Sequence, residues 1–150
     1  MKKHGESLSL GPEVIQLLLP HRRPFLMVDR IIAYLRKPRP MMQTSRHLSI
    51  NEPIFDGHFP GVALFPGAFL FEGLGQTAQL LGTFVGLQRA YENIGGDPDE
   101  LLQGFQNLEL GFRLEPGFQQ KAAESFLAAG EQVTIPRLAV TAAVNMKFLK

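Results

Sequence analysis

Two titratable residues, His58 and Glu72, stand almost alone in the most apolar part of the sequence. Between Gly57 and Tyr91 the only other residue with a charge or a titrating ring is Arg89. Acids and bases in apolar surroundings can have shifted pKa values, which proton-transfer catalysis uses. The pair therefore indicates general acid–base chemistry. The residues alone also allow a histidine that only shapes its loop and a carboxylate that pairs at an interface.

The two residues lie in different predicted elements. His58 lies within residues 51–67, whose three prolines and three glycines predict a shaped loop with little regular structure. Glu72 lies in a long helix predicted over residues 68–92, which the Gly-Gly-Asp-Pro of residues 95–98 ends. The proposed chemistry thus needs the loop to be held against the helix.

The predicted long helix carries two unusual features. One is a polar stripe at helical spacing, formed by Glu72, Gln76, Gln79 and Thr83. The stripe faces solvent, or it lines a site or a subunit interface. The other is a set of glycines at positions 73, 75, 82 and 86, each costing about 1 kcal/mol relative to alanine. Packing must hold such a helix, and the glycines would let a sheet or a second helix approach closely.

The remaining pattern predicts an α+β protein of one domain, residues 1–150. A short helix is expected over residues 12–18. Strands are expected at residues 25–35, 42–50, 102–114, 121–129 and 133–149. One long buried helix among several strands suggests a curved antiparallel sheet around the helix.

Composition excludes several classes of protein. A hydrophobic content of 45% with 19% charged residues fits a soluble globular protein, and the absence of cysteine excludes a disulfide scaffold or a thiolate metal site. No His, Asp and Glu have zinc-ligand spacing and no glycine-rich phosphate loop follows a strand, so we expect no metal and no cofactor. Residues 1–7 lack a signal-peptide stretch, and polar residues and glycines interrupt residues 62–87. We therefore expect a cytoplasmic protein without a membrane span.

Positive charge is concentrated between residues 22 and 46, although the net charge of the chain is only +1. Seven basic residues lie there and only Asp29 opposes them: Arg22, Arg23, Arg30, Arg36, Lys37, Arg39 and Arg46. The segment is a solvated face or a docking patch for an acidic partner. We do not expect nucleic acid, because few aromatics interleave and no binding motif is present.

Two sequence blocks resemble the 3-hydroxyacyl-acyl-carrier-protein dehydratases of the FabZ type. Residues 19–30 read LPHRRPFLMVDR and resemble the family's LPHRxPFLxVDR. Residues 51–61 read NEPIFDGHFPG, and Phe-Pro-Gly at residues 65–67 precedes Glu72 and Gln76. The two blocks occur in the family's order with its fourteen-residue spacing from His58 to Glu72. Within the first block, His21 and Asp29 are interpreted as structural.

The resemblance implies a hot-dog fold, in which a sheet wraps one long central helix. It also implies a homodimer, often assembled further into a trimer of dimers, with His58 of one subunit beside Glu72 of the other. The expected partner is an acyl carrier protein that presents the acyl thioester. The expected reaction converts (3R)-3-hydroxyacyl-acyl-carrier-protein to the trans-2-enoyl form in fatty-acid biosynthesis.

The chemistry of dehydration suits these residue types. The imidazole of His58 would remove the C2 proton, and the carboxylic acid of Glu72 would protonate the leaving C3 hydroxyl, directly or through a water. Gly67 matches the position whose backbone amide binds the thioester carbonyl. The substrate-binding residues expected beside them are Phe59, Phe65, Phe69 and Gln76.

Three other functions stay open. A dehydratase-isomerase of the same fold tends to carry Asp in place of Glu72. A hot-dog thioesterase usually lacks the His-Phe-Pro-Gly block. The third is a non-catalytic acyl-binding module that kept the fold. Turnover of a 3-hydroxyacyl thioester separates them by product.

Overall fold

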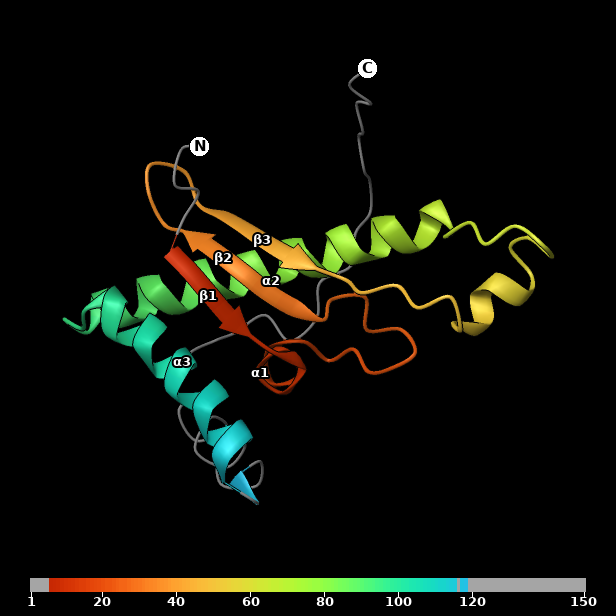
Figure 1. Cartoon of the computed structure of the whole chain (residues 1–150). Helices are drawn as coiled ribbons and strands as arrows, with labels where there is room; N and C mark the ends of the chain where they lie inside the picture. The colour runs from red at the N-terminus through yellow and green to blue at the C-terminus, as the bar shows by residue number, and fades with distance from the viewer. Residues whose placement is uncertain (1–5, 116, 119–150) are drawn as a thin grey trace.

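The computed structural model describes residues 6–115, 117 and 118. A three-stranded antiparallel sheet of order β1-β2-β3 lies against one long helix, so the predicted α+β class is confirmed (Figure 1). The elements in chain order are β1 (Glu6–Leu10), α1 (Pro12–Leu18), β2 (Arg30–Leu35), β3 (Met41–Ser45), the 3-10 helix η1 (Pro53–Asp56), α2 (Gly67–Asn93) and α3 (Pro98–Leu114). The short helix and the long helix lie where the sequence predicts them, whereas β1 was not predicted.

Strands β2 and β3 form a hairpin but are shorter than predicted. Residues 25–29 do not belong to β2 and residues 46–50 do not belong to β3. The physical reason is that side chains bind the backbone of the first segment. Gln76 accepts a hydrogen bond from the Met27 amide, and Arg46 donates one to the Leu26 carbonyl. These groups are unavailable for a strand ladder.

One face of α2 packs on the sheet and on α3. Its buried residues are Gln76, Leu80, Thr83, Phe84 and Gln88. The Phe84 ring lies between Tyr34 of β2, at a ring-centroid distance of 5.3 Å, and Phe105 of α3, at 4.8 Å. The polar stripe is therefore only partly in contact with solvent: Gln76 is 1% exposed and Thr83 is 4% exposed, whereas Glu72 and Gln79 are half-buried.

The glycines of α2 act differently from one another. A Cβ on Gly73 would lie 3.5 Å from the Cβ and the carbonyl oxygen of Met27, so the segment before β2 packs on the helix there at ordinary van der Waals distance. Gly82 and Gly86 have no such neighbour within 4 Å among the described residues. The close approach of a sheet or a second helix that the glycines predict is thus not found at these three positions in the described part of the chain.

Residues 102–114 form a helix and not the predicted strand. Asp97 caps α3 by accepting a hydrogen bond from the Asp99 amide at 2.9 Å, and Pro98 occupies the first turn. Four of the five residues that α3 buries are spaced three or four apart, as a helix face requires: Pro98, Leu102, Phe105 and Glu109, with Gly111 as the fifth. The strands predicted at residues 121–129 and 133–149 lie outside the described residues.

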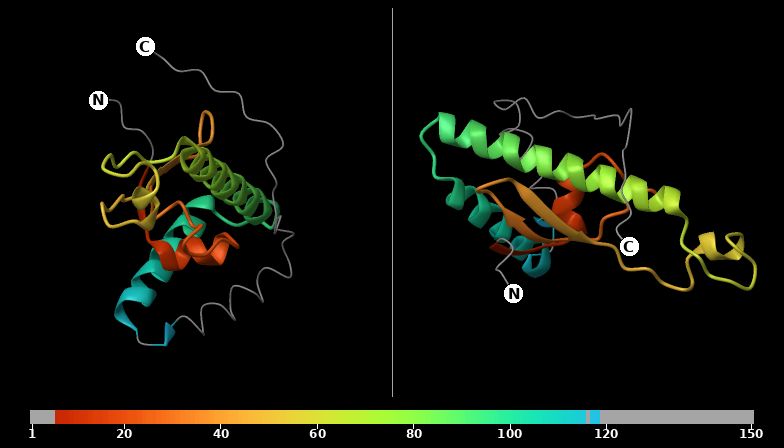
Figure 2. Two further views of the ribbon diagram at one scale, coloured as in Figure 1. Left: turned by 90° about the vertical axis from the view of Figure 1, so that its right-hand side faces the viewer. Right: turned by 90° about the horizontal axis from the view of Figure 1, so that it is seen from above.

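The segment between β3 and α2 projects beyond the end of the sheet, away from α1 and α3 (Figures 1 and 2). Apart from η1 it has no regular secondary structure, as its prolines and glycines predict. Within the described part of the chain, no helix is long and apolar enough to cross a membrane.

Candidate active site

His58 lies in the projecting loop, partly exposed, with its imidazole fixed at one nitrogen. Its Nδ1 is 2.8 Å from the carbonyl oxygen of Leu64. A carbonyl only accepts hydrogen bonds, so Nδ1 carries the ring hydrogen and the neutral ring has its lone pair on Nε2. The ring also stacks on Phe59, at a centroid distance of 4.3 Å. The loop therefore presents His58 as a base at Nε2.

Glu72 lies in the second turn of α2 with its side chain 31% exposed. Its Oε1 accepts a hydrogen bond from Nε2 of Gln76 at 2.8 Å. Among the described residues, Oε2 has no hydrogen-bond partner. One carboxylate oxygen is thus held by the protein and the other is free to carry or transfer a proton.

Gln76 is fully buried and its amide connects α2 to the segment before β2. Its Oε1 accepts from the Met27 amide at 2.8 Å, and its Nε2 donates to the Phe25 carbonyl at 2.8 Å as well as to Glu72. Rotating the amide by half a turn would break all three bonds, so its orientation is settled. Gln76 therefore holds Glu72, and its predicted contact with substrate stays a prediction.

A second histidine, His21, lies beside Glu72. From the sequence His21 is interpreted as structural, and this contact is not predicted. Its Nε2 is 3.6 Å from Oε1 of Glu72, with the histidine side chain 23% exposed. The available signal was its place in the LPHRRPF block, one of the two blocks that carry the family resemblance.

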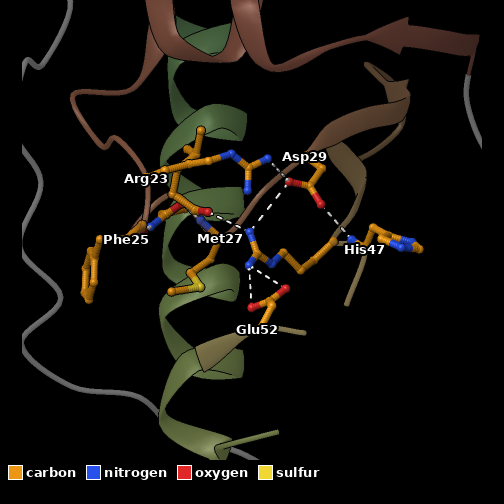
Figure 3. A network of polar contacts seen from close by, with 9 residues as sticks. Arg23, Phe25, Met27, Asp29, His47 and Glu52 are labelled. Carbon is orange, nitrogen blue, oxygen red and sulfur yellow. Dashed lines mark hydrogen bonds and ion pairs between the residues drawn. The ribbon is translucent and has the colours of Figure 1, made fainter. Parts of the chain in front are cut away.

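Arg46 ties together the two blocks that the sequence singled out. Its guanidinium donates to both carboxylate oxygens of Glu52, at 3.0 and 2.9 Å, and to the Leu26 carbonyl at 3.0 Å. It also lies 3.6 Å from Asp29, whose other oxygen accepts from the His47 amide at 2.7 Å. Figure 3 shows these contacts converging between the residue 25–29 segment and the start of the His58 loop. The network therefore holds the two sequence blocks, residues 19–30 and residues 51–61, against each other.

The structure does not bring His58 and Glu72 together within the chain. Among the described residues they share no hydrogen bond and no ion pair, and their contacts are with different neighbours. Gly67 is the first residue of α2, so its amide has no acceptor within the helix. Two of the predicted substrate-binding aromatics do meet: the Phe65 and Phe69 rings lie 5.8 Å apart.

Three of the seven basic residues in the segment are paired with carboxylates, two of which, Glu92 and Asp99, are distant in sequence. The ion pairs are Arg23–Asp29 at 3.0 Å, Arg46–Glu52 at 2.9 Å, Arg36–Glu92 at 3.8 Å and Arg36–Asp99 at 3.7 Å. Lys37 and Arg39 lie exposed in the turn between β2 and β3. The basic charge offered to a partner is therefore smaller than the sequence suggests. In the described part of the chain no three His, Asp or Glu residues are grouped so that they could hold a metal ion.

An antiparallel sheet against one long helix, with a histidine loop leading into that helix and a carboxylate in its second turn, defines an α+β protein of the hot-dog class. The chain belongs to the family of FabA-like domains, whose model its residues 19–113 match. The resemblance seen in the sequence is thereby confirmed.

Named relatives are similar to this chain over part or most of its length. The 3-hydroxyacyl-acyl-carrier-protein dehydratase FabZ of Chlamydia trachomatis serovar L2 is 39% identical over 113 residues, which are 75% of this chain and 70% of that protein. FabZ of Aeromonas salmonicida is 46% identical over 83 residues, 54% of each chain. FabZ of Polynucleobacter necessarius is 48% identical over 64 residues, 43% of this chain and 42% of that one.

Proposed function

We propose that this chain dehydrates (3R)-3-hydroxyacyl-acyl-carrier-protein to the trans-2-enoyl form in fatty-acid biosynthesis. Relatives at 39–48% identity bear the dehydratase name. The observation that carries the proposal for this chain is the His58 imidazole, whose Nδ1 is bound to a backbone carbonyl. That bond leaves Nε2 as a base in the loop that the resemblance assigns to catalysis.

The first half of the reaction is removal of a proton from C2. The thioester carbonyl makes that proton acidic, and Nε2 of His58 accepts it. The electrons of the C2–H bond form the C2–C3 double bond as the C3–O bond breaks. Since His58 becomes an imidazolium, the Leu64 carbonyl that accepts from Nδ1 also stabilises the charged ring.

The second half is protonation of the leaving hydroxyl. Oε2 of Glu72 donates its proton to the C3 oxygen, directly or through a water, and water leaves. His58 has then gained one proton and Glu72 has lost one, and transfer of a proton from the imidazolium back to the carboxylate through solvent restores both groups for the next turnover. The elimination changes no oxidation state, so no redox cofactor takes part. Gln76 supports this role because it holds the other carboxylate oxygen, Oε1, in place.

Negative charge that develops on the thioester oxygen needs a hydrogen-bond donor. The Gly67 amide at the first position of α2 has no acceptor within the helix and points outward from its positive dipole end. We assign it that role. Phe59, Phe65 and Phe69 are proposed to contact the acyl chain.

The reacting pair is proposed to come from two copies of the chain. His58 and Glu72 share no contact within one chain, and the loop that carries His58 projects away from the sheet (Figure 2). A homodimer would place His58 of one copy beside Glu72 of the other. Association into a trimer of dimers, docking of the acyl carrier protein and a single domain over residues 1–150 belong to the same proposal.

Replacing His58 with Ala tests the function. We expect hydration of a crotonyl thioester, the reverse reaction, to fall at least about a hundredfold with the far-UV circular dichroism unchanged, since general base catalysis contributes at least that much. His47→Ala is the matched control, because the imidazole of His47 is exposed. Wild-type hydration by the His58 variant would overturn the assignment. Release of free thiol by the wild-type protein would instead indicate a thioesterase, and no turnover a binding module.

A further inference from the structure

We propose that His21 is a positioning residue for Glu72: its Nε2–H and the Gln76 amide both face Oε1, so the transferable proton is carried on Oε2. This inference deepens the proposed function and rests on Glu72 acting as the acid. It concerns a histidine outside the His-Phe-Pro-Gly loop, on the segment between α1 and β2.

The position of His21 is fixed by its neighbours. The Arg22 guanidinium donates to the carbonyls of His21, Leu19 and Gln16, at 2.7, 2.9 and 3.1 Å. These bonds hold the chain as it leaves α1. The His21 ring is also stacked with Phe25, at a centroid distance of 6.2 Å. The imidazole therefore lies in a defined place relative to α2.

The surroundings of the two ring nitrogens decide which of them carries the hydrogen. Nδ1 of His21 is buried without a hydrogen-bond partner among the described residues, whereas Nε2 is 3.6 Å from Oε1 of Glu72. A hydrogen on Nδ1 would be a buried donor with no acceptor, which folded proteins avoid. A hydrogen on Nε2 instead points at a carboxylate oxygen. The favoured neutral ring thus has its hydrogen on Nε2.

Two donors then face one oxygen of Glu72. Oε1 accepts from Gln76 at 2.8 Å and lies within reach of the positive end of the His21 Nε2–H bond. N–H groups that face a carboxylate oxygen favour its unprotonated form, so a proton on that oxygen is disfavoured. The proton of the acid is therefore held on Oε2, which has no partner among the described residues and is free to face a substrate.

A structural role for His21 and a positioning role make different predictions. If the ring served only to stack with Phe25, then His21→Phe would keep that contact and the activity. If Nε2–H is needed, His21→Phe should lower kcat about 10- to 100-fold, the loss typical of a misplaced catalytic group, with KM changed less than about twofold. His21→Gln, whose amide nitrogen can replace Nε2–H, should restore most of the rate. His47→Phe serves as the control histidine.

The Glu72→Gln background separates this inference from the proposed function. A Glu72→Gln variant with the wild-type rate would overturn the proposed role of Glu72. If Glu72→Gln is inactive but His21→Phe retains the wild-type kcat, only the role of His21 is overturned. Where both are impaired, adding His21→Phe to Glu72→Gln should cause no further loss, because the interaction is already gone.

The position of the hydrogen on the His21 ring can also be measured on the unmodified protein, so the proposal remains testable if the His21 variants do not fold. Nitrogen-15 NMR of the histidine rings, recorded at about pH 8 where an ordinary histidine is neutral, reports which ring nitrogen carries the hydrogen. A hydrogen on Nε2 of His21 is the expected result. A ring with its hydrogen on Nδ1 alone would overturn the proposal. The His21→Phe sample assigns the signal. If that variant does not fold, samples that lack His4, His47 or His58 in turn assign the other three histidines and leave His21 by exclusion.

Discussion

Tyr34 and Gln88 form a polar pair inside the apolar layer between β2 and α2. The Tyr34 hydroxyl donates to Oε1 of Gln88 at 2.5 Å, and both residues are almost completely buried. Burial raises the pKa of Tyr34 above its ordinary value of 10.0, while the positive charge of Arg36 opposes the shift and the negative charge of Glu92 adds to it. The phenol thus favours its neutral form in the folded protein.

The chain has only two tyrosines, so Tyr34 can be titrated alone in a Tyr91→Phe variant. We expect its tyrosinate absorbance to develop above pH 10.0 in the folded protein. Above pH 10.0 the unfolded chain loses the phenol proton while the folded chain keeps it, so the free energy of unfolding should fall as pH rises. Urea unfolding across that range measures the slope. A Tyr34→Phe variant should lack this contribution, and titration of Tyr34 at or below the ordinary value would contradict the prediction.

Single side chains set where the elements of this fold begin and end. Gln76 of α2 and Arg46 after β3 bind the backbone of residues 25–29, and β2 begins only after that segment. Glu109 of α3 acts in a similar way on α1. Its Oε2 accepts from the Gly11 amide at 2.7 Å, at the start of that helix. Amides at the start of a helix have no acceptor within that helix, so the Glu109 carboxylate of α3 supplies the missing acceptor for α1.

Replacing Glu109 with Ala should therefore destabilise the protein. The buried Gly11 amide would lose its acceptor and Arg113 would lose its partner, at a cost of about 1–3 kcal/mol in the free energy of unfolding. Urea unfolding measures the change. Asn107→Ala on an exposed position of α3 is the control and should change stability by less than about 0.5 kcal/mol. Equal stability of the two variants would argue against residues 102–114 packing as a helix on α1.

At the scale of the whole molecule, a single chain leaves apolar side chains exposed to solvent around the proposed catalytic loop. Large apolar side chains that are more than half exposed include Phe59 at 54%, Val62 at 64%, Leu70 at 57% and Leu74 at 57%. They lie on the projecting loop and on the first turns of α2, next to His58 and Glu72. Burying such surface favours association, and the proposed site needs a second copy.

Complementation between two inactive variants tests this shared site. Chains with His58→Ala and chains with Glu72→Ala are co-expressed with different tags, and the mixed dimer is compared with each variant. A mixed dimer holds one intact site of two, so a random mixture should regain about a quarter of the wild-type rate. A control that pairs His58→Ala with the double variant should regain nothing. Absence of recovery in a purified mixed dimer would place the reacting pair within one chain.

The sequence by itself determined the α+β class, the long helix and the residue types of the site. These follow from local signals: prolines and glycines that end elements, apolar spacing, and two motif blocks around His21 and His58. For residues 102–114 the sequence holds conflicting signals: its apolar residues suit a strand, whereas the Asp97 cap, Pro98 in the first turn and the spacing of the buried residues suit a helix. Packing against α1 and Phe84 decides in favour of the helix.

Only the tertiary structure decided how the polar atoms of the site are used. The Leu64 carbonyl selects the free nitrogen of His58, and Gln76 selects the free oxygen of Glu72. The closeness of His21 to Glu72, 3.6 Å across a gap of fifty-one positions in sequence, depends on the chain path between α1 and β2. Hydrogen bonds depend on distances and directions in space, and residue spacing along the chain does not contain that information.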